Sequence, residues 1–271
     1  MPMFLLKFDN IKQQFMNRKG RLVNPMLPFI DLPPLEADVH TGVMGLEAAT
    51  EQQKNGITFG GEKHDATLMF MLFAVTLTAK NEMPIVSPFD DPIPKNILGL
   101  HRVSSNIVPP DDVAPHFFFG DERILSFWNN PFRTEKKLAR FRCSISMDFS
   151  MTAEMSRPQK MYSSFINKLW AAWMQSRGHK VIPNVSFPDE YEEDYWIEGW
   201  PRHSVIAVSS VGVLTHGNAQ TWLNGVMRIR EELAPQHILR YGPVIDGEQM
   251  EGCTYFDNDN KRAANGWKWF I

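Results

Sequence analysis

Short apolar runs alternate with amphipathic stretches from about residue 116 to residue 245. The apolar runs are HFFF, CSISM, VIP, SVIAVSS and HILRY, and the turn-forming residues around them are typical of buried strands. Two stretches carry apolar residues at helical spacing, one at Met161, Phe165, Leu169 and Trp173, the other at Trp222, Val226, Ile229 and Leu233. This alternation predicts an α/β fold with parallel strand–helix repeats in an incomplete or elaborated (β/α) barrel-like arrangement.

The remaining segments predict additions to one domain. Apolar residues at helical spacing near the start predict an amphipathic helix that either packs on the domain or docks on a membrane surface or a partner. Four prolines from 25 to 34 predict an extended connection, and the apolar segment 66–79 predicts a buried strand or core helix. We expect an N-terminal helix, a Pro-rich connection and an irregular elaboration over 1–113, an α/β core over 114–245, and a C-terminal extension packed on the core over 246–271.

Polar residues follow each predicted strand of the core. They are Asp121, Glu122 and Arg123 after the first run, Asp148 and Ser150 after the second, Asn184 and Ser186 after the third, Ser209 and Ser210 after the fourth, and Tyr241 after the fifth. The carboxyl ends of parallel strands share one edge, and ligand sites of α/β folds form there. The sequence therefore predicts a functional site at the strand ends.

Asp121 and Asp148 are the acidic pair of this predicted site. Neighbouring strands would bring their carboxylates within the range of acid–base pairs or of a shared divalent cation, which is the candidate cofactor. On this interpretation Asp148, Asp121 and Glu122 are catalytic, Asp148 and Asp121 are the metal ligands, and Arg123 neutralises an anionic group of the substrate. The alternative is structural, because aspartates just past strands often cap helices.

Two further positions are candidates for substrate binding. The acidic, aromatic segment 188–201 is either a solvated surface or a recognition loop in which Trp200 stacks on the substrate. His216 lies just beyond the serine turn and is the histidine best placed for acid–base chemistry. The sequence contains no GxGxxG, GxxxxGK[ST], GxSxG or HExxH motif, which argues against the common nucleotide-binding, serine-hydrolase and zincin classes.

Composition limits the partners and the cellular location that we expect for the protein. The formal net charge of -3 does not favour binding to nucleic acid, although a local basic patch is compatible with it. Cys143 and Cys253 are the only cysteines, which suits a reducing compartment. The longest apolar segment falls short of the roughly 20 residues that span a bilayer, and the first apolar stretch is too short for a secretion signal. We expect a cytoplasmic protein with no membrane span.

The strings HFFFGDERILSFWNNP, SMDFSM, MYSSFINKLWAAWMQSRGHKVIPNVSF, GWPRHSVIAVSSVG and ILRYGPV resemble an uncharacterised family of bacterial, phage and mobile-element proteins, domain of unknown function family 4417. The resemblance covers about residues 114–245. In the family pattern the first strand is followed by two acids, an aromatic residue and an arginine. Asp121 and Arg123 match this pattern, whereas Gly120 stands in place of the first acid and Glu122 in place of the aromatic residue. The resemblance implies a mobile-element setting and no particular reaction.

These observations leave several functions open. The leading hypothesis is a hydrolase-type enzyme that uses the strand-end carboxylates on a small-molecule or polymer substrate. The first alternative is a non-enzymatic binding protein of a phage or mobile element with a protein partner, since Trp, Phe and Met are common at interfaces. The second alternative is a nucleic-acid-processing factor.

Overall fold

The computed structural model of the chain describes residues 69–104, 111–188, 193–216, 218–249 and 251–265. The chain divides into two compact units, Met1–Thr76 and Leu77–Ile271. The described part of the first unit contains a 3-10 helix, η2 (Met69–Ala74), inside the apolar segment expected to be a strand or a helix. The predicted N-terminal helix and the Pro-rich connection lie outside the described residues, and the domain boundaries expected from the sequence stay a prediction.

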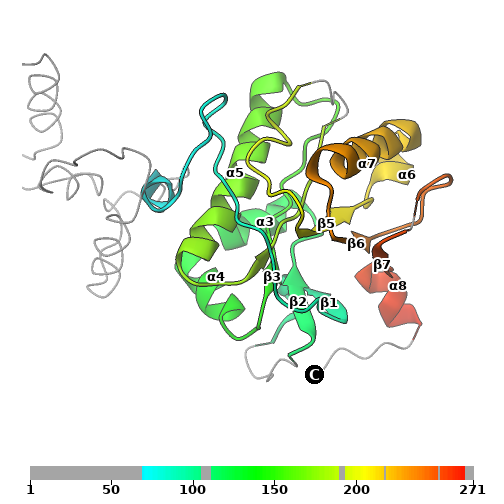
Figure 1. The fold of residues 1–271 in the computed structure, drawn as a ribbon. Helices are drawn as coiled ribbons and strands as arrows, with labels where there is room; N and C mark the ends of the chain where they lie inside the picture. The colour runs from blue at the N-terminus through cyan, green and yellow to red at the C-terminus, as the bar shows by residue number, and fades with distance from the viewer. Residues whose placement is uncertain (1–68, 105–110, 189–192, 217, 250, 266–271) are drawn as a thin grey trace, which may run out of the picture. The chain divides into compact units, whose positions relative to one another are not determined.

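The described part of the second unit contains short parallel strands that follow one another along the chain (Figure 1). They are β1 (Asn96–Gly99), β2 (Val113–His116), β3 (Ser144–Ile145), β4 (Val181–Ile182), β5 (Val205–Ser209), β6 (His237–Tyr241) and β7 (Cys253–Phe256). They pair in the order β1-β2, β3-β4 and β5-β6-β7, and a parallel bridge between Asn184 and Ala207 connects the last two groups. No ladder among the described residues closes a barrel, which confirms a barrel-like α/β fold that is incomplete.

Helices follow most of these strands, and α5 and α7 flank them (Figure 1). The helices are η3 (Leu100–Arg102), α3 (Asp121–Trp128), α4 (Pro131–Leu138), α5 (Arg157–Ser176), α6 (Val213–His216), α7 (Ala219–Leu233) and α8 (Asp259–Ala264). A capping box of Ser156 and Gln159 begins α5, and Gly178 with φ +85 follows its end. In the described chain β4 and β6 lead into loops, so the strand–helix repeat is interrupted there. Within these ranges every helix is too short or too polar to cross a membrane.

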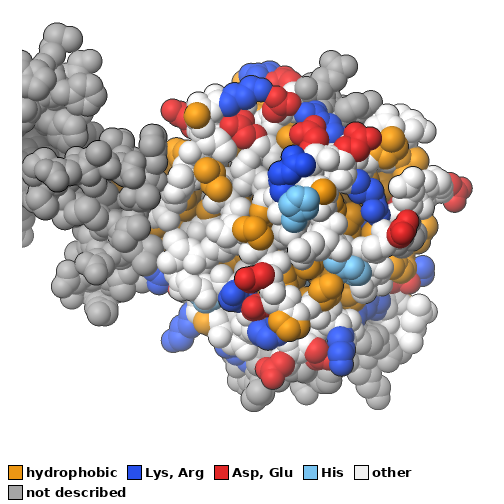
Figure 2. All heavy atoms as spheres, in the orientation of Figure 1, with side chains coloured by type: hydrophobic (Ala, Val, Ile, Leu, Met, Phe, Trp, Pro, Cys, Tyr) orange, Lys and Arg blue, Asp and Glu red, His pale blue; other side chains and the backbone are white. Residues whose placement is uncertain are grey.

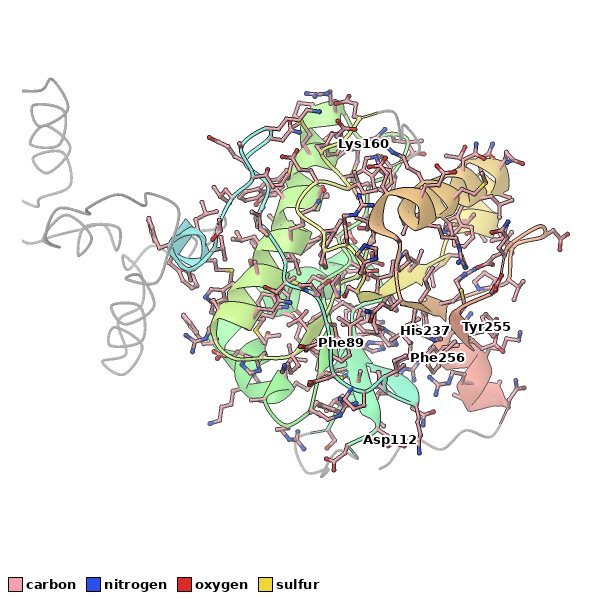
Figure 3. All side chains as sticks on the ribbon, in the orientation of Figure 1. Phe89, Asp112, Lys160, His237, Tyr255 and Phe256 are labelled. Carbon is pink, nitrogen blue, oxygen red and sulfur yellow. The ribbon has the colours of Figure 1, made fainter. Side chains whose placement is uncertain are left out.

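Side chains from the successive strands meet in one buried core. It contains Ile97, Ala114, Ile145, Ile182, Ala207, Leu239 and Phe256, one from each strand in turn. Phe89 joins Phe256 in this core from a loop before β1, and both are labelled in Figure 3. Alternate residues of parallel strands point inward in barrel-like folds. The shared core therefore aligns the strands and brings their carboxyl ends to one side.

Two segments differ from the sequence-based expectation. The strand expected at HFFF is wrong in position, because β2 ends at His116 and the phenylalanines follow it. The strand contains Pro115, which removes a backbone donor and makes this segment resemble a loop in the sequence. Phe117 and Phe118 are buried beyond the strand end, where Phe118 stacks on Tyr241 with ring centroids 4.8 Å apart. The C-terminal residues add a strand, since β7 pairs in parallel with β6.

Candidate functional site

Five polar residues form a network at the carboxyl ends of β2, β3 and β4, which we call the strand-end cluster. Its members are Asp121, Asp148, Ser150, Asn167 and Asn184. Asp121 is the first residue of α3, Asp148 and Ser150 lie in the loop after β3, Asn184 follows β4, and Asn167 lies in α5. The structure therefore places Asp148 against Asn184 and Asp121 against Ser150.

Asp148 is held by Asn184. Asn184 is fully buried, and its Nδ2 donates to Asp148 Oδ1 at 2.7 Å and to the Met147 carbonyl at 3.3 Å. The backbone N–H of Asn184 donates to Ser146 Oγ at 2.8 Å, which fixes the end of β4 against β3. Burial raises the pKa of Asp148 to about 6, the Asn184 hydrogen bond opposes that rise, and the charge of Asp121 adds to it. Asp148 can therefore exchange a proton near neutral pH.

Asp121 is tied to the loop after β3. Ser150 donates to it twice, from Oγ at 3.0 Å to Oδ1 and from the backbone N–H at 3.2 Å. Burial raises the pKa of Asp121, Ser150 lowers it, and the charge of Glu122 raises it again. Asp121 does not cap α3, because Gly120 is the N-cap and no side chain caps the helix. Its structural role is to connect two strand-end loops, and this leaves its partly exposed carboxylate beside the Asp148 loop.

Asn167 belongs to the cluster although the sequence analysis did not identify it. Its Oδ1 accepts the Phe149 N–H at 2.8 Å, and its Nδ2 donates to the Phe149 carbonyl at 3.0 Å. The same Nδ2 reaches Ser186 Oγ at 3.3 Å. The sequence did contain a signal, because Asn167 stands between the apolar positions Phe165, Ile166 and Leu169 of the helix, and buried amides need partners. Asn167 thus clamps the backbone next to Asp148.

Glu122 and Arg123 are exposed on the first turn of α3. A Cβ placed at Gly120 would lie 2.5 Å from Glu122 Oε2, so the Glu122 carboxylate fills the space beside the position where the family pattern has its first acid. Burial, then the charges of Arg102 and Arg123, lower the pKa of His101 to about 4. Arg123 therefore adds positive charge near the end of β1, and no partner for its guanidinium exists among the described residues.

The polar residues at the ends of β5 and β6 bond to neighbouring loops and to the C-terminal segment. Ser210 Oγ donates to the Pro243 carbonyl at 2.6 Å, and Ser209 Oγ accepts the Val211 N–H at 3.2 Å. Burial raises the pKa of Tyr241, whose hydroxyl oxygen accepts the Asp259 N–H at 2.8 Å. Ser210 thus connects the loops after β5 and β6, and Tyr241 connects β6 to the C-terminal segment. Neither makes a described contact with the strand-end cluster.

Two other candidates lie elsewhere. Trp200 is only 6% exposed, and the Lys168 Nζ lies 5.1 Å from its ring centroid, so Trp200 belongs to the core and not to a recognition surface. Lys168 also donates to the carbonyls of Tyr195 and Trp196, which holds this segment against α5. His216 lies in α6, but its side chain lies outside the described part of the structure.

A second buried polar group joins β1, β2 and α8. His116 Nδ1 accepts the Phe118 N–H at 3.0 Å, so in the neutral ring Nε2 carries the proton and faces Asp259 Oδ1 at 3.4 Å. Burial lowers the pKa of His116, which favours this neutral form. Asp259 Oδ2 accepts the Gly99 N–H at 3.1 Å. Because His116 and Asp259 are far apart in the sequence, no local pattern could have paired them.

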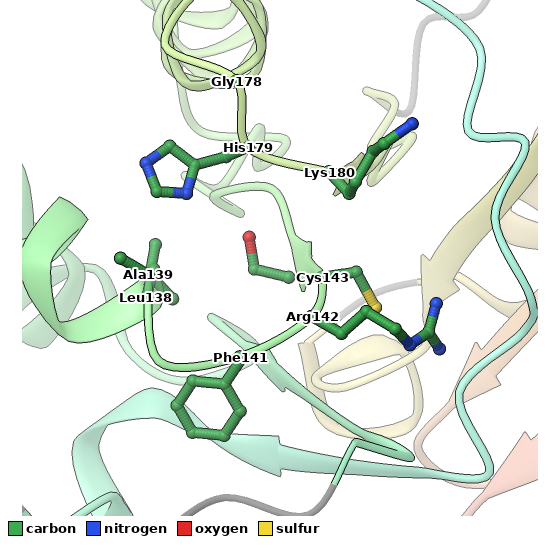
Figure 4. Close-up of a pocket in the computed structure, with 9 residues that line it drawn as sticks. Leu138, Ala139, Phe141, Arg142, Cys143, Gly178, His179 and Lys180 are labelled. Atoms are coloured by element: carbon green, nitrogen blue, oxygen red, sulfur yellow. The ribbon is translucent and has the colours of Figure 1, made fainter.

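Metal binding by the acidic pair stays a prediction. Among the residues that the structure describes, no group of three or more His, Cys, Asp and Glu side chains is arranged to hold a metal ion. A pocket of about 270 Å³ lies at the opposite, amino ends of β3 and β4 (Figure 4). It is lined by Leu138, Ala139, Phe141, Arg142, Cys143, Ser144, Gly178, His179 and Lys180, none of which is a predicted site residue. On the face shown in Figure 2, basic, acidic and apolar side chains are intermixed.

Comparison with known proteins connects the second unit to an uncharacterised family. The family model described as Domain of unknown function (DUF4417) matches residues 77–258, which extends beyond the stretch recognised in the sequence. The chain is 25% identical over 161 residues to the Gene 1 protein of Mycobacterium phage D29, covering 57% of this chain and 60% of that protein. It is 26% identical over 155 residues to the Gene 1 protein of Mycobacterium phage L5, covering 55% and 68%. The match thus spans less than two thirds of the D29 protein, and no solved structure matches the chain.

Proposed function

This chain belongs to the DUF4417 family, and on that premise we propose that it is a hydrolase of a phage or other mobile element with the strand-end cluster as its reacting centre. The two phage relatives support the setting. The family is one of unknown function, so support for a reaction comes from the site alone. Its position supports the proposal, because ligands of parallel α/β folds bind at the carboxyl ends of the strands.

The observation that carries the proposal is that Asp148 has a raised pKa and a carboxylate held in place by Asn184. A general acid–base group works best when its pKa lies near the working pH, and burial raises the pKa of Asp148 to about 6. Asn184 fixes Asp148 Oδ1, and no hydrogen bond to Oδ2 exists among the described residues. Oδ2 is therefore the oxygen that can accept a proton. Rigid support of this kind keeps the carboxylate in one orientation without reorganisation during the reaction.

The roles follow from this arrangement. Asp148 removes a proton from a water molecule while the water oxygen bonds to the electrophilic atom of the substrate. The bond to the leaving group then breaks, and Asp148 returns the same proton to the leaving group. Asp121 keeps the Asp148 proton affinity high through its negative charge, and Arg123 neutralises an anionic part of the substrate. Hydrolysis by this route consumes one water and leaves Asp148 unchanged.

The test is a panel of chromogenic ester, amide, glycoside and phosphodiester substrates with the full chain. For any substrate that is hydrolysed, we expect Asp148→Asn to lower kcat by about 10²–10⁴-fold. Asp246→Asn is the matched control, because Asp246 is exposed and lies in the loop after β6. Full activity of Asp148→Asn, or hydrolysis of no substrate in the panel, would overturn the proposal.

A surface feature favours a second candidate, a non-enzymatic binding protein with a protein partner. Val211, Leu214 and Val244, after β5 and β6, are 50%, 61% and 52% exposed. Exposed apolar residues that gather in one region are typical of protein contacts. Size-exclusion chromatography and pull-down of the wild type and Leu214→Glu test this candidate. A monomer that captures no partner in either form would remove it.

A further inference from the structure

Asn184 has a side-chain acceptor that meets no donor among the residues that the structure describes. Its side chain is fully buried, and within the described part of the chain Oδ1 has no hydrogen-bond partner. The orientation of the amide is fixed, because Nδ2 contacts two acceptors, Asp148 Oδ1 and the Met147 carbonyl, and an amide turned by 180° would bring oxygen against both. The unpaired atom is therefore the oxygen, and it lies on the same amide that holds Asp148.

Buried acceptors without a donor are uncommon because their desolvation is not compensated. They are concentrated at sites where an ordered water or a ligand completes the hydrogen bonds. Since Asn184 is fully buried at the end of β4, only a small donor can reach its oxygen, and water is the smallest candidate. The neighbouring Asp148 Oδ2 is a second acceptor without a described donor, so a single water can donate to both oxygens.

We infer that Asn184 is a positioning residue that, together with Asp148, holds the water consumed in the reaction. The water donates one O–H to Asn184 Oδ1 and the other to Asp148 Oδ2. Its oxygen lone pairs then face away from both acceptors and toward the substrate. This inference rests on the proposed function for the fate of the water, whereas the binding of the water depends on the structure alone.

Asn184 is well supported for this task. The backbone N–H of Asn184 donates to Ser146 Oγ, and Asn184 forms the parallel bridge to Ala207 of β5. The Asp148 side is held through Asn167, which contacts both backbone polar groups of Phe149. Both acceptors thus stand on segments fixed to strands and to α5. A water held between them keeps its orientation before the substrate arrives, which is the condition for efficient attack.

The experiment is a high-resolution crystal structure of the full chain, of Asn184→Asp and of Asn184→Leu. We expect an ordered water within hydrogen-bond distance of both Asn184 Oδ1 and Asp148 Oδ2 in the wild type. Asn184→Asp keeps an oxygen at this position and should keep the water, whereas Asn184→Leu should lose it. A wild-type structure with no water at Asn184 Oδ1, or with a protein donor on it, overturns the inference. Because Asn184→Leu can fail to fold, the wild type and Asn184→Asp are sufficient for the decision.

Kinetics separate this inference from the proposed function. With a hydrolysed substrate, Asn184→Leu should lower kcat by about 10²-fold with little change in KM, since the water and Asp148, but not the substrate, lose their support. Asn184→Asp should retain more activity and shift the pH profile upward, because two adjacent carboxylates share one proton. If the water is present but Asp148→Asn has full activity, the hydrolase proposal fails and the water site stands. If the water is absent but Asp148→Asn is inactive, the hydrolase stands and the role of Asn184 fails.

Discussion

Replacing Asp148 with asparagine should stabilise the protein at neutral pH while it removes the proposed acid–base group. Burial raises the pKa of Asp148 from 3.8 in the unfolded chain to about 6. The folded protein therefore binds more protons than the unfolded chain between these two values, and its stability falls as the pH rises through this window. Near pH 4 the folded carboxyl is protonated and the unfolded one about half protonated, so most of the cost has disappeared, and the rest disappears at lower pH. The asparagine side chain carries no charge at any pH, so the Asp148→Asn variant avoids the cost.

The size of the effect follows from the shift. A change from 3.8 to about 6 corresponds to about 3 kcal/mol at about 1.36 kcal/mol for each pH unit. Asp148 is partly exposed, and solvent screening reduces this figure to about 1–2 kcal/mol. Asparagine at this position can still accept the Asn184 Nδ2–H, so the hydrogen bond that holds residue 148 survives. The variant should therefore gain about 1–2 kcal/mol above pH 7.

Urea unfolding of the wild type and Asp148→Asn at pH 7.5 and pH 4 measures this directly. The difference in the free energy of unfolding should be fully present at pH 7.5 and much smaller at pH 4. Asp246→Asn is the control, and this exposed replacement should change stability by less than about 0.5 kcal/mol at either pH. If Asp148→Asn is destabilised at pH 7.5, or if its advantage persists unchanged at pH 4, then the folded protein does not raise the pKa of Asp148.

Three other substitutions test the packing around the strands. Arg240→Met leaves the buried Glu248 carboxylate without its ion-pair partner and should lower the free energy of unfolding in urea by about 3–5 kcal/mol. The double variant Arg240→Met/Glu248→Gln should lose less, because it leaves no unpaired charge. Asn167→Leu removes two hydrogen bonds to the backbone after β3 and should lower the free energy of unfolding by about 2–4 kcal/mol. Unchanged stability would contradict this prediction. Gly225→Ala places a Cβ into the Phe187 ring and should lower Tm through a cost of about 1–3 kcal/mol; an unchanged Tm would show that the ring moves aside freely.

Some contacts of the strand-end cluster could be predicted from the order of the strands, and others could not. Asp148 and Asn184 follow consecutive predicted strands, and the structure joins them at 2.7 Å, because adjacent parallel strands bring their ends together. Asn167 was missed because it lies on a helix whose apolar stripe is explained by core packing alone. Trp200 was expected on a surface, yet the ammonium of Lys168 covers it in the core. Whether a charged, aromatic segment faces solvent depends on what packs over it, which no local pattern records.

The sequence by itself determined the α/β class, the long helices α5 and α7, and the strands β3 to β6, because periodicity and turn residues are local properties. Only the tertiary structure decided the position of β2, the addition of β7 beside β6, and the buried contact of His116 with Asp259. These features depend on segments distant in sequence that become neighbours when the shared core forms. The same holds for Asn184 Oδ1, which has no hydrogen-bond partner among the described residues, because only the folded structure shows which groups surround an atom.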